Sequence, residues 1–555
     1  MSMYAQELNP IPQETARVAH AAYPHGTLAM RLRDVLGGIY RDEQFAALFS
    51  SRGRPAEAPW RLAVVLVLQY VEGLTDRQAA DAVRGRIDWK YALALPLEDA
   101  GFDASVLSEF RTRLVEAGAE RLLLDALLAL CKERGWLKAG GKQRTDATHV
   151  LAAARSLSNL ECVGETLRAA LNELATVAPD WLVQQITSEW LERYEHRVEN
   201  YRLPKEKSKR TVLAEQIGAD GVHLLRALEQ AEAPTALSEL ASIRVLRQVW
   251  EQYYELSKGG AKWRDDPVSS EKGGVIRSPY DPEARTGKKR ERIWLGYKVH
   301  LTETCDVSSQ TPHLVTAVAT TPACITDVEM TALIQEDLAQ RNLLPDEQVV
   351  DSGYVDGELL SLSQQTYGLV LLGPALADNS WQAKAGKGFE STHFQIDWQA
   401  HCAICPQGQT SSRWTSVTAP ERVEVVFART TCAACPCRAD CTRSQTTGRV
   451  LHLRPQAAHE ALLARRQEQE TSAFRQRYAV RAGIEGTLSQ GVRVMGLRHA
   501  RYVGLPKTHF QHILTAAALN VVRIDALLTQ TTRGQTRHSA LAGLASHPAL
   551  KRPAA

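Results

Sequence analysis

The stretch DEQVVDSGYVD, residues 346–356, decides the fold that this sequence predicts. Its apolar run QVV is typical of a buried strand that ends at Asp351, where a Ser-Gly turn leads into a helix. Strand and helix patterns precede it in order: IWLGYKVHLTE (293–303) and HLVTAVATT (313–321) are expected strands, and DVEMTALIQEDLAQR (327–341) is an expected helix. Strand, strand, helix and strand together indicate an α/β fold.

Two further acids accompany Asp351, which is expected at the carboxyl edge of the sheet, where α/β proteins place their chemistry. Asp146 lies in KQRTDATHVLAAAR (142–155), a segment expected to begin as a strand after a Gly-Gly turn. Glu485 lies much later, in a stretch otherwise crowded with arginines. Each acid alone is more typical of a turn, a cap or a solvated helix, so the hypothesis of a site depends on all three together.

The stretch around Glu485 reads RYAVRAGIEGTLSQGVRVMGLRHAR (477–501). Tyr478, Arg481 and Glu485 are three and four residues apart, so in one helix they share a face. We interpret Arg481 as a phosphate contact, with pairing to Glu485 along the helix as the alternative. Three separated carboxylates suit Mg²⁺ or Mn²⁺, and two such ions about 3.5 to 4 Å apart promote attack at a phosphodiester.

Basic residues gather in two places although the net charge of the chain is only +3. Residues 461–510 hold nine Arg or Lys against three Glu, and RTGKKRER (285–292) forms a second cluster. Such clusters suit neutralisation of phosphates, although a solvated face is the equally open alternative. Lys298 lies on the expected strand GYKVH and is interpreted as a further DNA contact.

Six of the ten cysteines lie between residues 402 and 441, in CAIC and CAACPCRADC. Paired C-x-x-C turns predict a tetrahedral zinc site, because each turn offers two thiolates. Two ligand sets are open on spacing alone, and redox-active or buried thiols are the alternative to zinc. The sets are Cys402, Cys405, Cys432 and Cys435, or Cys405, Cys432, Cys435 and Cys441.

The first 140 residues have helical patterns throughout. Thr75 and Gln78 in LTDRQAADAVRG form a predicted capping box, and a second helix is expected at DASVLSEFRTRLVEAG (103–118). These helices are similar to a helix-turn-helix unit, with an ordinary helical bundle as the alternative. Five arginines favour DNA binding: Arg77, Arg84, Arg86, Arg111 and Arg113.

The domain boundaries follow from these patterns. The longest apolar run, LAVVLVL (62–68), is far below the ~20 residues of a membrane span, and no signal pattern begins the chain, so a cytoplasmic protein is expected. We expect a helical domain at 1–140, a catalytic core at 141–157 and 259–373, a helical insertion at 158–258, a Cys-rich zinc-binding insertion at 374–460, a C-terminal catalytic helix region at 461–530 and a disordered tail at 531–555.

These residues carry a family resemblance that covers almost the whole chain. TDATHV, VVDSGYVD and YAVRAGIEGTLSQGVR, with Asp146, Asp351 and Glu485, resemble the DDE transposases of bacterial insertion sequences, in the branch with a Tyr-x2-Arg-x3-Glu signature. GYKVHLTETCD, TPACITD and CAACPCRADCT also fit. The signature usually continues with Lys seven residues after Glu, whereas this sequence has Val492 there and Arg493 beside it.

The resemblance implies a ribonuclease-H-like core in which Asp146, Asp351 and Glu485 bind two Mg²⁺ or Mn²⁺ ions. It implies DNA contacts by Tyr478, Arg481, Arg493 and Lys298, and it favours Cys405, Cys432, Cys435 and Cys441 for one structural Zn²⁺. The implied activity is cleavage of element ends, the terminal inverted repeats in double-stranded DNA, and strand transfer to target DNA by a homodimer. The alternative is a non-catalytic zinc and helix-turn-helix DNA-binding protein.

Overall fold

The computed structural model divides the chain into two compact units. The first comprises Met1–Leu137, Val307–Leu314 and Ala516–Ala555, and the second comprises Lys138–Asp306 and Val315–Thr515. The structure describes residue 3, residues 9–50, 52–257, 260–269, 273–306, 311–386, 388–418 and 421–531, and residues 541 and 544. The predicted tail therefore lies outside the described residues apart from residues 531, 541 and 544. Within the described part, no helix is long and apolar enough to cross a membrane.

The N-terminal part of the first unit is helical, as predicted. Thr75 caps α4, and its side chain and that of Gln78 form the expected capping box. The buried helix α3 precedes α4 across a turn in which Gly73 adopts a positive φ of 68°. The helices are α1 (Gln13–Ala22), α2 (Leu28–Leu36), the 3₁₀ helix η1 (Asp42–Leu48), α3 (Pro59–Glu72), α4 (Asp76–Gly85), α5 (Ile87–Ala92), α6 (Ser105–Glu116) and α7 (Leu122–Glu133).

Several arginines of this region are engaged within the unit itself. Arg111 pairs with Asp76, and Arg86 pairs with Glu72 and with Asp88. These contacts connect α4 to its neighbours, so a part of the local basic charge stabilises the helices.

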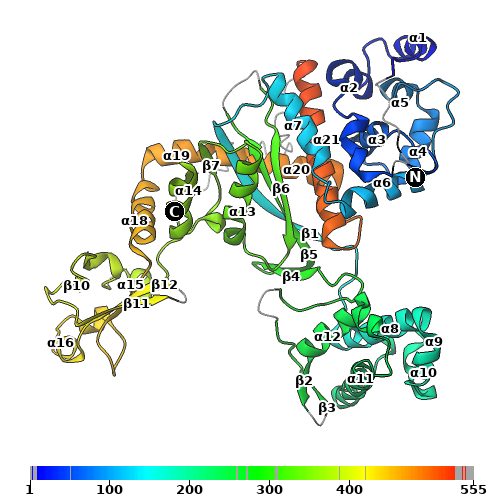
Figure 1. The fold of residues 1–555 in the computed structure, drawn as a ribbon. Coiled ribbons are helices and arrows are strands. Elements are labelled where there is room, and N and C mark those ends of the chain that lie inside the picture. Colours follow the sequence, from blue (N-terminus) through cyan, green and yellow to red (C-terminus); the bar gives the residue numbers. More distant parts are fainter. Residues whose placement is uncertain are drawn as a thin grey trace. The chain divides into compact units, whose positions relative to one another are not determined.

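A mixed sheet forms the centre of the second unit (Figure 1). Strand β5 pairs antiparallel with β1, β4 and β6, whereas β7 runs parallel to β1 and to β8. Helix α13 (Asp327–Gln340) connects β6 to β7, and α14 (Gly357–Tyr367) connects β7 to β8. The predicted α/β class is confirmed. The strands are β1 (Lys142–Leu151), β4 (Arg285–Lys289), β5 (Arg292–Thr304), β6 (Val315–Pro322), β7 (Glu347–Val349) and β8 (Val370–Leu372).

The insertion after β1 has a helical core formed by three long helices: α8 (Asn159–Val177), α11 (Lys207–Ala227) and α12 (Ala241–Tyr253). Two shorter helices, α9 (Pro179–Val183) and α10 (Ser188–Tyr194), lie between α8 and α11. The expectation that it is helical to residue 258 is wrong at its end, where β2 (Tyr254–Ser257) and β3 (Gly260–Trp263) form a hairpin. A cross-strand contact between Tyr254 and Trp263, with ring centroids 5.4 Å apart, accounts for the strand pairing.

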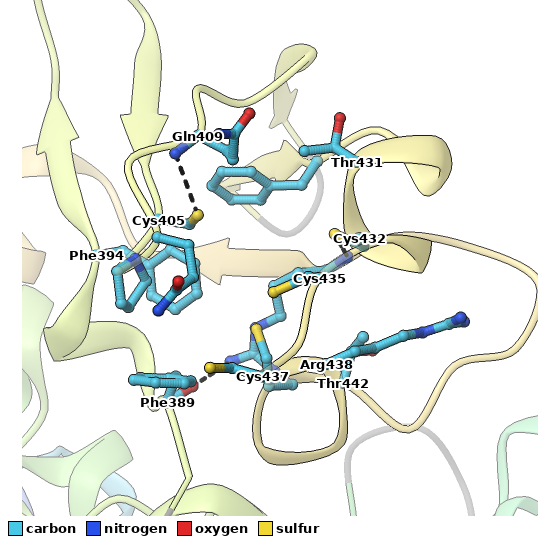
Figure 2. Close-up of a pocket in the computed structure, with 15 residues that line it drawn as sticks. Phe389, Phe394, Cys405, Gln409, Thr431, Cys432, Cys435, Cys437, Arg438 and Thr442 are labelled. Carbon is cyan, nitrogen blue, oxygen red and sulfur yellow. Dashed lines mark hydrogen bonds between the residues drawn. The ribbon is translucent and has the colours of Figure 1, made fainter.

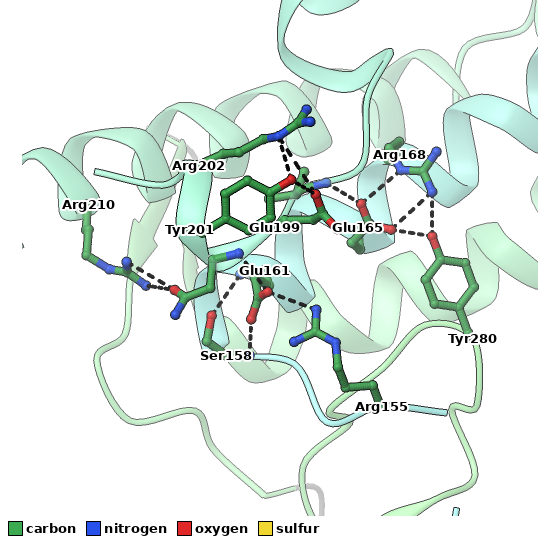
Figure 3. A network of polar contacts seen from close by, with 12 residues as sticks. Arg155, Ser158, Glu161, Glu165, Arg168, Glu199, Tyr201, Arg202, Arg210 and Tyr280 are labelled. Atoms are coloured by element: carbon green, nitrogen blue, oxygen red, sulfur yellow. Dashed lines mark hydrogen bonds and ion pairs between the residues drawn. The ribbon is translucent and has the colours of Figure 1, made fainter. Parts of the chain in front are cut away.

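Buried carboxylates hold this insertion together (Figure 3). Glu165 accepts hydrogen bonds from Arg168, from the Tyr280 hydroxyl and from the Val198 backbone. Glu161 accepts from Arg155 and from two backbone N–H groups. Because hydrogen bonds satisfy both carboxylates, we assign this network a structural role.

The Cys-rich region contains a small sheet of its own, and a compact apolar cluster includes Phe394, Phe427 and Val425. The strands are β9 (Gln395–Asp397), β10 (Cys402–Ile404), β11 (Arg413–Thr418), β12 (Glu421–Val426) and β13 (Val450–Leu453); the helices are α15 (Trp381–Ala385), α16 (Arg429–Ala433) and α17 (Arg438–Cys441). From there α18 (Gln456–Glu468) and α19 (Ser472–Tyr478) lead to α20 (Gly483–Met495) and α21 (Leu505–Leu528).

Candidate active site

Two neighbouring parallel strands position the first two acids. Arg144 on β1 pairs with Val349 on β7. Asp146 and Asp351 each follow these partners by two residues, so the register brings both acids to the same level of the sheet. Asp351 accepts a hydrogen bond from the Gly353 backbone at 2.8 Å, and Asp146 accepts one from the Ala147 backbone at 2.8 Å.

One guanidinium group contacts all three acids. Arg481 Nη2 lies 2.8 Å from Asp146 Oδ2 and 3.7 Å from Asp351 Oδ2, and Nη1 lies 3.1 Å from Glu485 Oε1. The structure therefore brings Asp146, Asp351 and Glu485 together around one cation. The alternative in which Arg481 pairs with Glu485 is present in this geometry, but as one of three ion pairs.

The expectation of one continuous helix through Tyr478, Arg481 and Glu485 is wrong. Tyr478 ends α19, Arg481 lies in the 3₁₀ turn η6 (Ala479–Ala482), and Glu485 lies in the first turn of α20. The Arg144 guanidinium donates to the Val480 carbonyl at 2.6 Å and competes for the oxygen that a regular α-helix would use.

Sequence reasoning did not identify the buried network that holds α20 against the sheet. Arg144 pairs with Glu303 on β5 at 2.6 Å, and Glu303 accepts a hydrogen bond from Thr487 of α20 at 2.6 Å. A Cβ atom on Gly483 would lie 2.0 Å from Arg144 Nη1, so any other residue there would have to displace the Arg144 guanidinium. Arg144 is two residues before Asp146 on the same strand face, which is a signal in the sequence, but its pairing with Glu303 depends on the register with β5.

We expect Arg144→Met to destabilise the second unit by about 3 kcal/mol, because it leaves the buried Glu303 carboxylate without its cation. Urea unfolding monitored by circular dichroism measures this. The double variant Arg144→Met/Glu303→Met is the control, and it should be less destabilised than Arg144→Met alone. Equal midpoints for Arg144→Met and the wild type would contradict the role of the ion pair.

The electrostatics of the three acids follow from their graded exposure. Burial raises the pKa of Asp146 to about 6, against the opposing effect of Arg481, and Asp351 contributes a further rise. Burial lowers the pKa of Arg481, but the acids outweigh it and the pKa lies above its ordinary value. Glu485 is the outermost acid, with 68% of its side chain exposed. Three carboxylates this close require a cation between them.

The other predicted DNA contacts have different surroundings. Tyr478 stacks on Phe474 with ring centroids 5.6 Å apart, and burial raises its pKa, with further charge effects from Arg481 and the three acids. Lys298 Nζ contacts Asp327 at 3.0 Å and donates to a backbone carbonyl, so its ammonium group is engaged within the protein. Arg493 is exposed near the end of α20.

The thiols favoured for zinc share one pocket (Figure 2). Cys405, Cys432, Cys435 and Cys441 line it together with Cys437, whereas Cys402 pairs within the β9–β10 hairpin. Two backbone N–H groups lie 3.4 Å from sulfur atoms: that of Gln409 donates to Cys405 Sγ and that of Arg449 to Cys432 Sγ. Such donors suit thiolates, so the donor atoms, though not their arrangement in this structure, suit a thiolate-bound metal.

Burial raises the pKa of the Cys441 thiol to about 11, against the effect of Arg449. Three neighbouring thiols raise the pKa of Cys441 further: Cys432, Cys405 and Cys435. These are the other three members of the favoured ligand set. Among the residues that the structure describes, no group of three or more His, Cys, Asp or Glu has an arrangement that could hold a metal ion. At the acids, the Arg481 guanidinium lies between the carboxylates instead.

Comparison with known protein families gives two matches. Residues 404–525 match the family described as a transposase DDE domain, and this range includes the favoured cysteines and Glu485. Residues 18–113 match the family described as Transposase domain (DUF772), which covers most of the N-terminal helices. No curated protein and no solved structure matches the chain.

Proposed function

We infer that this chain is a DDE transposase of the insertion-sequence type, the identity that its matches to a transposase DDE domain and to a transposase domain support. Transposases act on DNA, and DDE domains in general use divalent metal ions. We propose further that this protein binds the terminal repeats of an insertion sequence in double-stranded DNA, cleaves phosphodiesters with two Mg²⁺ or Mn²⁺ ions and transfers strands to target DNA. We also propose that the protein is cytoplasmic and acts on DNA as a homodimer.

The observation that carries this proposal is the convergence of Asp146, Asp351 and Glu485, from three separate segments, on one cation. A non-catalytic DNA-binding protein would not need this convergence. The sheet supports a ribonuclease-H-like core, because an antiparallel β6-β5-β1 part continues into parallel β7 and β8.

In the proposed mechanism, Asp146, Asp351 and Glu485 would hold two divalent ions, and such ions would supply activation of the attacking oxygen and stabilisation of the leaving oxygen. The buried network of Arg144, Glu303 and Thr487 fixes the helix that carries Glu485. Tyr478, Arg493 and Lys298 remain proposed DNA contacts, of which Lys298 would first have to leave Asp327. One structural Zn²⁺ is proposed at Cys405, Cys432, Cys435 and Cys441.

A plasmid that carries the flanking sequences of the gene provides the test. We expect the purified protein to cut the plasmid at the terminal repeats in the presence of Mg²⁺ or Mn²⁺. EDTA should abolish cutting but leave the binding of repeat DNA intact. Gel analysis of the products and a parallel binding assay measure the two steps. Repeat binding without cleavage in either metal would instead favour the non-catalytic DNA-binding protein.

We propose two successive roles for Arg481: it pairs with the three acids, and it then contacts a DNA phosphate. Its guanidinium pairs with all three carboxylates, and its Nε is buried without a hydrogen-bond partner among the described residues. Once the acids bind cations, the same guanidinium is free to contact a phosphate near the scissile bond.

We therefore expect Arg481→Ala to weaken binding of cleaved ends in Ca²⁺ and to flatten the dependence of log affinity on log salt by about one unit. Fluorescence anisotropy with a labelled duplex measures both effects. Arg475→Ala, an exposed arginine of α19, is the matched control. An unchanged slope with a lowered melting temperature would restrict Arg481 to its ion pairs with the acids.

A further inference from the structure

A second group of basic side chains contacts β1 just beyond Asp146. Thr148 and His149 follow Asp146 on β1 by two and three residues, and an arginine contacts each of them. Arg498 Nε donates to Thr148 Oγ1 at 2.9 Å, and Arg292 Nη1 lies 3.2 Å from His149 Nε2. Thr148 is the next position beyond Asp146 on the same face of β1, and His149 is the following residue of the strand.

Backbone hydrogen bonds hold both arginines in place. Arg292 begins β5 and pairs with Lys289 at the end of the β4–β5 hairpin. Arg498 follows α20 in a segment that adds to the free edge of β1: Leu151 N donates to Arg498 O at 2.8 Å, and Ala500 N donates to Leu151 O at 2.9 Å. The two side chains therefore come from ordered backbone on two different segments.

Arg292 and Arg498 differ from Arg481, which pairs with three acids. Within the described part of the chain, neither Arg292 nor Arg498 forms an ion pair, and the exposed Glu291 of the hairpin turn pairs with neither. Burial lowers the pKa of His149 to about 4, and the charged groups that add to this effect are all basic: Arg498, Arg292, Lys289 and His499. Clustered like charges repel each other, and an anionic ligand would offset that repulsion.

We propose that Lys289, Arg292 and Arg498 form a phosphate rim that binds the DNA backbone near the scissile phosphate. The inference rests on the proposed function, because the acids define the position of the scissile phosphate. Arginine suits this role because its planar fork binds phosphate oxygens in pairs.

The experiment measures binding of a labelled duplex of 30 base pairs and arbitrary sequence, in EDTA, over a series of KCl concentrations. Phosphate contacts are independent of sequence, and each lost contact lowers the salt slope by about 0.9. We expect Arg292→Gln/Arg498→Gln to lower the slope by about two units. The control Arg244→Gln/Lys262→Gln removes the same charge from exposed positions of the helical insertion and should change the slope by less than about half a unit.

Two further variants separate DNA binding from folding. Arg292→Lys/Arg498→Lys keeps both charges and should keep most of the slope, and Lys289→Gln changes an exposed side chain and should lower the slope by about one unit. The phosphate rim would be overturned if Lys289→Gln and Arg292→Gln/Arg498→Gln had the same salt slope as the wild type and as the control Arg244→Gln/Lys262→Gln. A lowered slope in a protein that never cleaves would count against the proposed function and leave the rim as a DNA-binding surface.

Discussion

Replacing any one of Asp146, Asp351 and Glu485 by its amide is expected to slow strand cleavage at least about a thousandfold. An amide keeps the shape of the side chain but loses the charge that attracts Mg²⁺. Binding of repeat DNA should stay within about twofold of the wild type, because phosphate contacts come from basic side chains elsewhere. Single-turnover cleavage and an anisotropy titration measure the two quantities separately.

Glu470→Gln is the matched control, because it removes one exposed carboxylate from the segment before α19 and should leave the rate unchanged. A wild-type rate in any one of the three amide variants would remove that acid from the proposed site. A parallel loss of DNA binding and melting temperature would instead indicate that the acid supports the fold.

Local signals in the sequence predicted those parts of the fold that depend on neighbouring residues. Thr75 and Gln78 predicted a capping box, and it occurs at the start of α4. The strands expected around Asp146 and Lys298 form β1 and β5, and consecutive residues of both strands are buried. These features need only a few consecutive residues.

The geometry of the site could not be predicted in the same way, because it depends on contacts between distant segments. Arg481 was expected on one helix face with Glu485, yet its contact with Asp146 joins residues 335 positions apart. The 3₁₀ turn at Arg481 lies against Arg144, which donates to the Val480 carbonyl from β1. Neither effect has a pattern in the local sequence.

The zinc ligands could be predicted from the sequence only in part. Spacing left two ligand sets open, and family resemblance favoured the one with Cys441. The structure brings Cys405, Cys432, Cys435 and Cys441 to one pocket but also brings Cys437 there. The choice of ligands is therefore a matter for metal analysis.

We expect about one zinc per chain in the purified protein, and we expect Cys441→Ser to weaken zinc binding at least about a hundredfold. Four thiolates saturate a tetrahedral ion and leave no position for water, so this zinc would stabilise the insertion and take no part in cleavage. Cys441 is half-buried beside the apolar cluster of Phe394 and Phe427, so its loss should also lower the melting temperature. Elemental analysis, a chelator titration and thermal unfolding measure these effects.

Cys437→Ser and Cys402→Ser are the matched controls, because each removes one thiol of the same region. Cys437 lines the same pocket as Cys441. Unchanged zinc content in Cys437→Ser with loss of zinc in Cys441→Ser would therefore show that Cys441 is a zinc ligand and Cys437 is not. Loss of zinc in Cys402→Ser with retention in Cys441→Ser would establish the set with two C-x-x-C pairs. A folded protein without zinc would contradict both sets. Because the insertion lies between Asp351 and Glu485 in sequence, loss of zinc should reduce cleavage only where it also destabilises the α20 segment.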